Sequence, residues 1–262
     1  MSDIHSTAVI SPSAAIGSDV VIGPYSVIGD NVVIGDGTRL VSHVVIRQDT
    51  VIGKNNLIHS GAVLGDDPQD IGYGGEKTFL EIGDDNQIRE YVTIHRGSKE
   101  GNTTVIGSSN MLMAYSHIGH DCVVHDHVIC TNYAGISGHC VIEDYAIIGG
   151  LAGLHQFVRV GKMSMVGGCS KVNVDIPPFT LCDGNPLRIR NVNSVGLRRR
   201  GVDRDTIDGL REAVRLLYNS GLNTKTALNL IKELPSTPEL TYLMDFVSAS
   251  RDGTYGRQEQ GK

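Results

Sequence analysis

The chain has 262 residues and a net charge of −6, so its bulk charge gives no reason to expect nucleic-acid binding. Its composition is 40% hydrophobic but only 5% aromatic, with no tryptophan and 32 glycines, which favours a regular, glycine-punctuated β architecture. Five cysteines without a Cys-x-x-Cys pair indicate neither a disulfide framework nor a zinc ribbon. No stretch reads as a signal peptide or a transmembrane segment, and we expect a cytoplasmic protein.

A six-residue hydrophobic repeat runs through the first two thirds of the chain. Steps of six from Ile4 to Val172 give 29 positions, of which 25 are isoleucine, leucine or valine. The three that are not hydrophobic are Asp70, Glu76 and Glu100. A period of six fits neither a helix nor an alternating strand, but it is typical of a chain that makes a short strand, turns and repeats. The repeat therefore predicts a parallel β-helix.

The [LIV]-G-x4 form of the repeat resembles that of the left-handed parallel β-helix acyltransferases. In these proteins three hexapeptides, about 18 residues, make one coil of a three-sided prism. The left-handed sense is implied by the resemblance alone, since periodicity carries no handedness and right-handed crossovers are the general rule.

Two polar, glycine-rich segments interrupt the repeat, at about 65–81 and 96–104. They are predicted to be loops that leave the prism, and loops of this kind often carry function. The β-helix is expected to span residues 1–185 with these two insertions, and a small helical domain to span 186–262.

Three helices are predicted in the C-terminal part. Apolar residues recur at helical spacing over 204–221, and a second helix over 223–235 is closed by a proline. The third segment, 236–250, opens with a capping-box pattern from Ser236 to Glu239. We expect these helices to cover the open end of the prism.

The ten histidines can be divided by their positions in the 18-residue coil. Residues 18 apart lie one coil apart, so four histidines from three successive coils fall on one edge of the prism: His117, His120, His139 and His155. The others fall elsewhere in this count: His5, His43, His59, His95, His125 and His127. The four clustered histidines are the candidate functional site.

Two further residues join this edge in the same count. Gly138 falls beside His120, where a glycine leaves room for the imidazole and exposes a backbone N–H, and Asp121 falls one coil from His139. The cluster suits two chemistries: a zinc site of imidazoles and water, or general-base catalysis by a histidine whose pKa lies near neutrality. The residues alone leave both open.

Several motifs resemble those of the acyl-acyl-carrier-protein:UDP-N-acetylglucosamine O-acyltransferases of lipid A synthesis. They are PQDIGYGGEKT (68–78), IREYVTIHRG (88–97), HIGHDC (117–122), HQFVRVG (155–161), GGCS (167–170), GNP (184–186) and GLRRRG (196–201). The resemblance implies transfer of a 3-hydroxylated acyl chain from the carrier-protein thioester to the glucosamine 3-position of UDP-N-acetylglucosamine. It implies neither a metal nor a cofactor, and it implies a homotrimer with active sites between subunits.

The resemblance also assigns roles. His120, the second histidine of H-x-x-H-D-C, becomes the general base, Asp121 its orienting carboxylate, and the Gly138 N–H the oxyanion donor. The residues implied to bind substrate are Gln69, Asp70, His117, His139, His155, Gln156, Asn193, Arg199 and Arg200. Met165 and Gly168 are implied to set the acyl-chain length, and the basic patch around Arg199 fits both a diphosphate and an acidic carrier protein.

Two departures from the family pattern leave two candidates for the acceptor sugar nucleotide. Gly72 stands where the common pattern carries a lysine, and Pro186 where some members have a histidine, so a 3-amino sugar nucleotide is an alternative acceptor. A γ-class carbonic-anhydrase-like zinc enzyme and a non-enzymatic scaffold are the alternatives on the same fold. A relative that N-acylates the next intermediate carries an additional N-terminal domain that we do not expect here.

Overall fold

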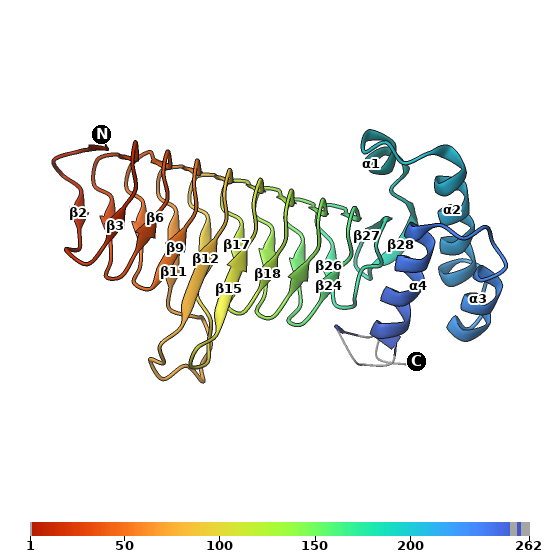
Figure 1. Cartoon of the computed structure of the whole chain (residues 1–262). Coiled ribbons are helices and arrows are strands. Elements are labelled where there is room, and N and C mark those ends of the chain that lie inside the picture. The colour runs from red at the N-terminus through yellow and green to blue at the C-terminus, as the bar shows by residue number, and fades with distance from the viewer. Residues whose placement is uncertain (1, 252–255, 258–262) are drawn as a thin grey trace.

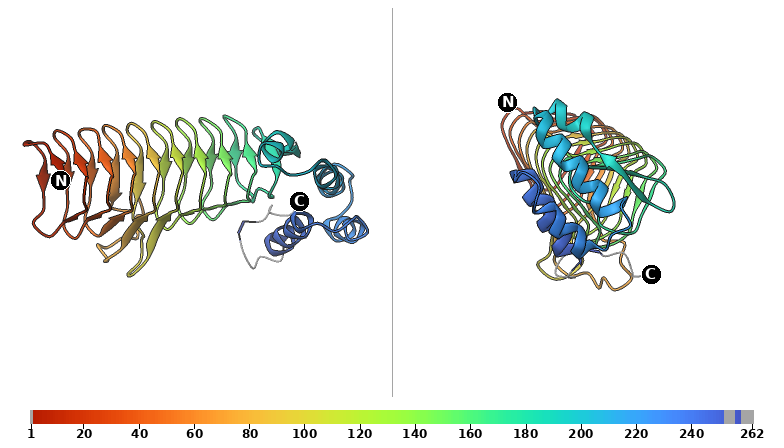
Figure 2. Two further views of the ribbon diagram at one scale, coloured as in Figure 1. Left: turned by 45° about the horizontal axis from the view of Figure 1, so that its top comes forward. Right: turned by 90° about the vertical axis from the view of Figure 1, so that its right-hand side faces the viewer.

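The computed structural model describes residues 2–251 and 256–257, and within them short strands coil into a three-sided prism. Four helices lie beyond one end of the prism, and the N-terminus lies at the other (Figure 1). A view along the prism shows the stacked coils almost in register, with the helices in front of them (Figure 2). The predicted architecture of a β-helix followed by a small helical domain is confirmed.

Each side of the prism is one sheet, which takes every third strand. Sheet A contains β1 (Asp3–Ile4), β4 (Val21–Ile22), β7 (Arg39–Leu40), β10 (Leu57–Ile58), β13 (Gln87–Ile88), β16 (Met111–Leu112), β19 (Ile129–Cys130), β22 (Ile147–Ile148), β25 (Met165–Val166), β27 (Thr180–Asp183) and β28 (Arg188–Val192). Sheet B contains β2 (Val9–Ile10), β5 (Val27–Ile28), β8 (Val45–Ile46), β11 (Val63–Asp66), β14 (Thr93–His95), β17 (His117–Ile118), β20 (Gly135–Ile136), β23 (Gly153–Leu154) and β26 (Lys171–Val172). Sheet C contains β3 (Ala15–Ile16), β6 (Val33–Ile34), β9 (Thr50–Ile52), β12 (Phe79–Ile82), β15 (Thr103–Ile106), β18 (Val123–Val124), β21 (Val141–Ile142) and β24 (Arg159–Val160).

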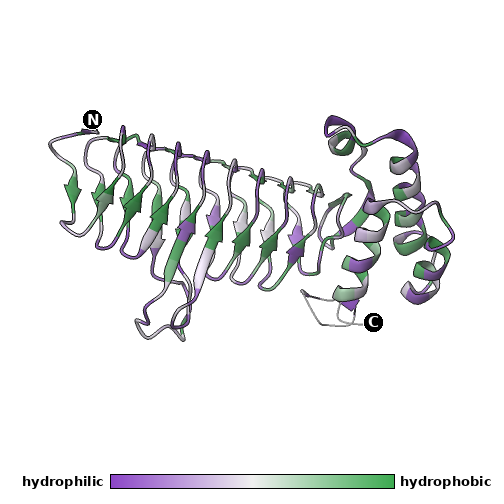
Figure 3. Ribbon diagram, in the orientation of Figure 1, coloured by the Kyte–Doolittle hydropathy of each residue, from purple (hydrophilic) through white to green (hydrophobic). Residues whose placement is uncertain are grey.

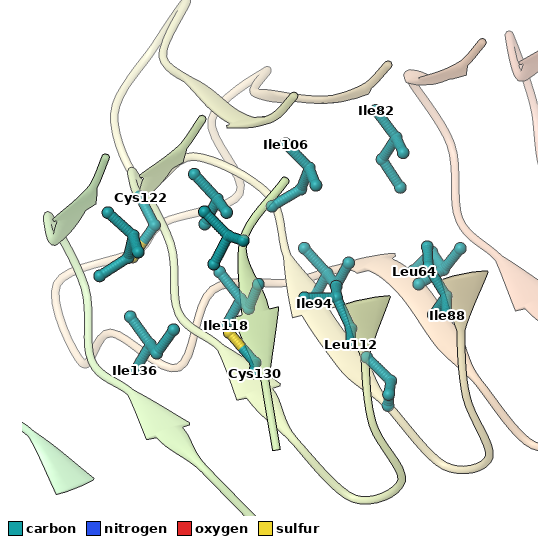
Figure 4. Close-up of a cluster of buried hydrophobic side chains, with 14 of the residues drawn as sticks. Leu64, Ile82, Ile88, Ile94, Ile106, Leu112, Ile118, Cys122, Cys130 and Ile136 are labelled. Atoms are coloured by element: carbon teal, nitrogen blue, oxygen red, sulfur yellow. The ribbon is translucent and has the colours of Figure 1, made fainter. Parts of the chain in front are cut away.

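The six-residue repeat is the inward position of these strands. Ile94, Ile118 and Ile136 are paired with one another across sheet B, and all three are fully buried. Figure 4 shows these residues with their counterparts from the other two sheets meeting inside the prism. A buried β-branched side chain suits this position, because it packs on a pleated surface at little cost in side-chain entropy. Cys122 and Cys140 are buried in the same core.

The corners of the prism are turns with left-handed backbone. A residue with φ near +55° recurs every six positions, as at Tyr115, Asp121 and His127, one for each corner of a coil. We name the corners by the sheets they join: A–B, B–C and C–A. Tyr91, Tyr115 and Tyr133 stack at the A–B corner, with ring centroids 5.0 and 4.9 Å apart.

Two loops leave the prism, and both leave it at the B–C corner. The first joins β11 to β12 over residues 67–78, and the second joins β14 to β15 over residues 96–102. Strand pairing therefore extends into both of the segments predicted as loops. In Figure 1 they project together below the coils. The loops lengthen their coils, so β14 pairs with β17 at a spacing of 24 residues (Thr93 with His117) instead of 18.

The helices are α1 (Ser194–Arg199), α2 (Arg204–Tyr218), α3 (Thr224–Ile231) and α4 (Pro238–Arg251). The short helix α1 was not predicted from the sequence. The capping box predicted at Ser236 is wrong, because the hydroxyl that accepts the first-turn Leu240 N–H belongs to Thr237, at 3.2 Å.

A second apolar cluster joins the helices to the last coil through Phe179, Val192 and Leu197. In Figure 3 α2 and α3 have hydrophobic and hydrophilic sides, as expected for helices packed on one side. β28 pairs antiparallel with β27, so the division expected between residues 185 and 186 falls in the turn between these strands. No helix among the described residues is long and apolar enough to cross a membrane.

Candidate active site

The predicted histidine edge is the B–C corner, the same corner from which both loops project. His120 follows β17, and it is buried, with 6% of its surface exposed. Its Nδ1 lies 2.7 Å from Oδ2 of Asp121. A carboxylate can only accept a hydrogen bond, so this contact places the proton on Nδ1 and leaves the Nε2 lone pair free to accept a proton.

Asp121 is held from the second loop. Its oxygens accept hydrogen bonds from the Ser98 hydroxyl at 2.6 Å and from the Asn102 side-chain amide at 2.8 Å. Burial by itself would raise the pKa of Asp121, but the hydrogen bonds from Ser98, His120 and Asn102 together hold the pKa below its usual value. The carboxylate beside His120 is therefore ionised at neutral pH.

Gly138 lies against the imidazole, as predicted. A Cβ built on this glycine would lie 2.6 Å from both Cε1 and Nε2 of His120, so no other residue fits there without moving the ring. Among the described residues, no group accepts a hydrogen bond from the backbone N–H of Gly138. The structure thus brings an unpartnered backbone donor next to the reactive nitrogen of His120.

His139 occupies the next coil at the same corner. Its ring stands edge-on to His120, with centroids 5.0 Å apart, and its Nε2 lies 3.6 Å from Oδ2 of Asp121. Phe157 stacks on its other face at 4.6 Å. His155 and Gln156, immediately before Phe157, are exposed at this corner, so the predicted edge is present with all four of its histidines.

His95 is a fifth histidine of the site, and the sequence analysis missed it. It is buried, its ring lies 5.1 Å from that of His117, and its Nδ1 has no hydrogen-bond partner among the described residues. The signal was present in the sequence. The second loop adds six residues to the coil, and once these are counted His95 shares the coil position of His155.

His117 is the most strongly perturbed of these histidines. Its Nδ1 lies 2.8 Å from the Thr93 hydroxyl. Burial, followed by the neighbouring His95 and His120, lowers the pKa of His117 to about 4. Burial also lowers the pKa of His95 and of His139. His117 is therefore neutral at physiological pH and can serve as a hydrogen-bonding group for an uncharged ligand atom.

This low pKa predicts a loss of stability in mild acid. The unfolded chain takes up a proton on His117 below about pH 6.5, whereas the folded chain does so only near pH 4, so the free energy of unfolding falls as the pH falls between these values. We expect His117 to contribute a loss of about 2 kcal/mol between pH 7 and pH 5. Urea unfolding of the wild type and of His117→Gln at both pH values measures it. An equal pH dependence in the two proteins would contradict the assignment.

The first loop places Gln69 and Asp70 in the open at the same corner, and both are exposed. Oδ1 of Asp70 accepts the N–H of Gly72 at 2.9 Å. The buried Arg96, which the sequence analysis did not single out, ties this loop to the prism through the Gly65 carbonyl, at 3.0 Å, and Asp67. Its guanidinium also donates to the Tyr73 hydroxyl at 3.1 Å.

The remaining predicted residues lie elsewhere on the chain. Asn193 is buried, caps α1 by accepting the Gly196 N–H, and donates to the Met163 carbonyl at 2.9 Å. Arg199 is exposed at the end of α1, and the next residue, Arg200, places its guanidinium 3.7 Å from the ring centroid of Tyr145 at the C–A corner.

Met165 and Gly168, the residues expected to set acyl length, lie on β25 and at the A–B corner that follows it. One chain therefore distributes the predicted site residues over all three corners of the prism.

The donor atoms at the B–C corner also have the spacing of a metal site. His120, Asp121 and His139 each offer one atom within 4.8 Å of the others. The Asp121 carboxylate is already engaged, because it accepts hydrogen bonds from Ser98, Asn102 and His120. A metal ion would have to displace this network, and the arrangement is better suited to a carboxylate–imidazole pair.

Comparison with known proteins agrees with this geometry. A family described as UDP N-acetylglucosamine O-acyltransferase, domain 2, matches residues 175–255, and the bacterial transferase hexapeptide family (six repeats) matches residues 13–48. The acyl-[acyl-carrier-protein]–UDP-N-acetylglucosamine O-acyltransferase of Thermodesulfovibrio yellowstonii is 50% identical over 255 residues, 97% of this chain and 99% of the relative.

Solved structures give the same result. LpxA from Acinetobacter baumannii matches with a TM-score of 0.91 and 47% identity over 98% of this chain and 99% of that chain. LpxA from Bacteroides fragilis, a UDP-N-acetylglucosamine acyltransferase, matches with a TM-score of 0.93 and 39% identity over 97% and 99%.

Fold and repeat together define a left-handed parallel β-helix transferase of the hexapeptide class. Within that class, the chain belongs to the acyl-acyl-carrier-protein–UDP-N-acetylglucosamine O-acyltransferase family, as its motifs predicted.

Proposed function

We propose that the protein transfers a 3-hydroxylated acyl chain from an acyl-carrier-protein thioester to the 3-hydroxyl of the glucosamine in UDP-N-acetylglucosamine, as the first step of lipid A synthesis. Family membership supports the reaction class. The observation that carries the proposal is the His120–Asp121 pair at 2.7 Å with the unpartnered Gly138 N–H beside it. A base and an oxyanion donor are the two groups that acyl transfer to a hydroxyl requires.

The proposed mechanism needs no covalent acyl-enzyme. Nε2 of His120 takes the proton of the sugar 3-hydroxyl as its oxygen attacks the thioester carbonyl carbon. The Gly138 N–H stabilises the negative charge that develops on the carbonyl oxygen. Collapse of this intermediate breaks the carbon–sulfur bond, and His120 returns the proton to the departing carrier thiolate. Asp121 keeps Nδ1 protonated and stabilises the imidazolium that forms in between.

Gln69, Asp70, His117, His139, His155 and Gln156 are proposed to position the substrates around His120. The lowered pKa of His117 supports a neutral imidazole that hydrogen-bonds a sugar group. Asn193, Arg199 and Arg200 are proposed to hold the nucleotide and its phosphates, for which guanidinium groups are well suited. Met165 and Gly168 are proposed to limit the length of the acyl chain.

The distribution of these residues supports a homotrimer. The base lies at the B–C corner, the Arg200 guanidinium lies over Tyr145 at the C–A corner, and Gly168 lies at the A–B corner. Groups at different corners of one prism face different directions, so their action on one substrate requires neighbouring copies. Light scattering on the purified protein measures the assembly, and a monomer with full activity would contradict this part of the proposal.

The reaction is tested directly with purified protein, UDP-N-acetylglucosamine or its 3-amino analogue, and acyl-carrier thioesters of graded chain length. We expect acylated sugar nucleotide by mass spectrometry and a preferred chain length. Preference for the 3-amino analogue would identify that acceptor. The absence of product with every combination would refute the proposed function.

Zinc analysis of the same preparation tests the alternative reaction class. The acyl-transfer proposal expects activity that survives dialysis against a chelator, with no stoichiometric metal. Stoichiometric zinc that is lost on replacement of His117 by alanine would instead favour a carbonic-anhydrase-like enzyme.

A further inference from the structure

We propose that Ser98 and Asn102, on the second loop, are positioning residues that hold the Asp121 carboxylate and thereby set the orientation of the His120 imidazole. No motif singled out either residue. The inference rests on the proposed function, because it takes His120 to be the base of the reaction.

The contacts around Asp121 come almost entirely from this loop. Oδ2 of Asp121, which faces His120, also accepts the Ser98 hydroxyl at 2.6 Å, and Oδ1 accepts the Asn102 amide at 2.8 Å. The backbone N–H of Ser98 lies 3.2 and 3.3 Å from the two oxygens. The backbone N–H of Asp121 donates to the Thr104 hydroxyl at 2.8 Å. Both carboxylate oxygens therefore have donors from the second loop, in addition to the His120 N–H that Oδ2 accepts.

The second loop is itself held by hydrogen bonds to the end of the first loop and the start of β12, so it can act as a rigid support. The Gly97 N–H donates to the Phe79 carbonyl at 3.2 Å, and the Gly101 N–H donates to the Lys77 carbonyl at 2.9 Å. Ser98 is buried, with 5% of its surface exposed, and its hydroxyl is engaged by Asp121. A buried and engaged hydroxyl is a poor candidate for contact with substrate, which separates positioning from binding.

The support has a predictable effect on the base. Asp121 is the ionised group in contact with Nδ1 of His120, and the Ser98 hydroxyl donates to the same oxygen that accepts the His120 N–H. Loss of this hydroxyl removes a short fixed donor from Oδ2, so the carboxylate and the imidazole that it holds can shift from the position that the reaction requires.

The experiment compares kcat and KM of Ser98→Ala, Ser98→Thr, Asn102→Ala and Asp121→Ala. We expect Ser98→Ala to lower kcat about tenfold, with both KM values within about twofold of wild type, and Ser98→Thr to restore most of the rate. We expect the double variant Ser98→Ala/Asp121→Ala to be no slower than Asp121→Ala alone, because Ser98 acts only through that carboxylate. A purely structural role would not combine a lowered kcat at unchanged KM with rescue by threonine and non-additivity in the double variant.

Controls separate the possible failures. Ser42→Ala removes a hydroxyl that is hydrogen-bonded to Ser60 at 2.8 Å on earlier coils, and it is expected to leave the rate unchanged. If Ser98→Ala does not fold, as judged by circular dichroism, Asn102→Ala carries the same test. Wild-type rates for the loop variants beside an impaired Asp121→Ala would overturn the inference alone. A fully active Asp121→Ala would overturn the proposed mechanism, and the inference with it.

Discussion

Replacement of His120 by alanine is expected to lower kcat by a factor of about 10²–10⁴, the usual contribution of a positioned general base. The side chain is almost fully buried, and among the described residues its hydrogen-bond partner is Asp121, through Nδ1. Its removal takes away the proposed proton acceptor and leaves the groups proposed to position the substrates in place. We therefore expect the KM for UDP-N-acetylglucosamine to stay within a few fold of wild type in steady-state assays of product formation.

His125→Ala is the matched control for this variant. His125 belongs to the same histidine-rich stretch, but its side chain is 45% exposed, and its nearest charged partner, Asp144, lies 3.9 Å away. We expect near wild-type kcat for this variant. Equal kcat values for the His120 and His125 variants would show that the base lies elsewhere.

Substitution of Gly138 by alanine is the second large effect that we expect, with a loss of kcat of about 10² or more. The added methyl group would lie 2.6 Å from Cε1 and Nε2 of His120, closer than carbon and nitrogen atoms approach, so the imidazole must move. A displacement of about 1 Å in a reacting group is enough for a loss of this size. The backbone N–H of Gly138 survives the change, so the loss reports the position of the base. Activity close to that of wild type would contradict the proposed pairing.

Stability measurements on a double variant test the cause of that loss. The three atoms nearest to the added methyl group all belong to the His120 ring. Gly138→Ala should therefore lower the melting temperature in the wild-type background and change it much less in a His120→Ala background. Gly209→Ala, on α2, serves as the control, because its methyl group meets no atom within 4 Å. That variant should be fully active and slightly more stable, since alanine is the better helix former.

The fold could be predicted from the sequence because each repeat in the sequence corresponds to one side of a coil in the structure. Each hexapeptide makes one side of the prism, so the position of Ile118 in the repeat already determines that it is buried beside Ile136. The same register placed Gly138 next to His120, and the structure confirms this contact. Where the chain is strictly periodic, distance along the sequence converts directly into distance in space.

Prediction failed where the period is broken. The second loop shifts the register of its coil, so the uncorrected count left His95 outside the site, although its ring lies 5.1 Å from that of His117. The roles of Ser98 and Asn102 depend on the path of an irregular loop back to Asp121, and no periodicity encodes that path. The short helix α1 follows directly from β28 and lacks the length at which apolar spacing becomes readable.

The left-handed corners of the prism have a consequence for how such a protein can change. The core is formed by two residues of each hexapeptide, such as Cys122 and Val124, whereas Asp121 and His139 occupy corner positions outside the core. Tyr115 and Tyr133 occupy the equivalent positions at another corner, with the same backbone conformation and a different surface. The residues that form the core and the residues that form the site thus occupy different positions of the same six-residue repeat. Substitutions at the corner positions can therefore adapt the site to a new acceptor or acyl chain, while the core positions, and with them the fold, stay unchanged.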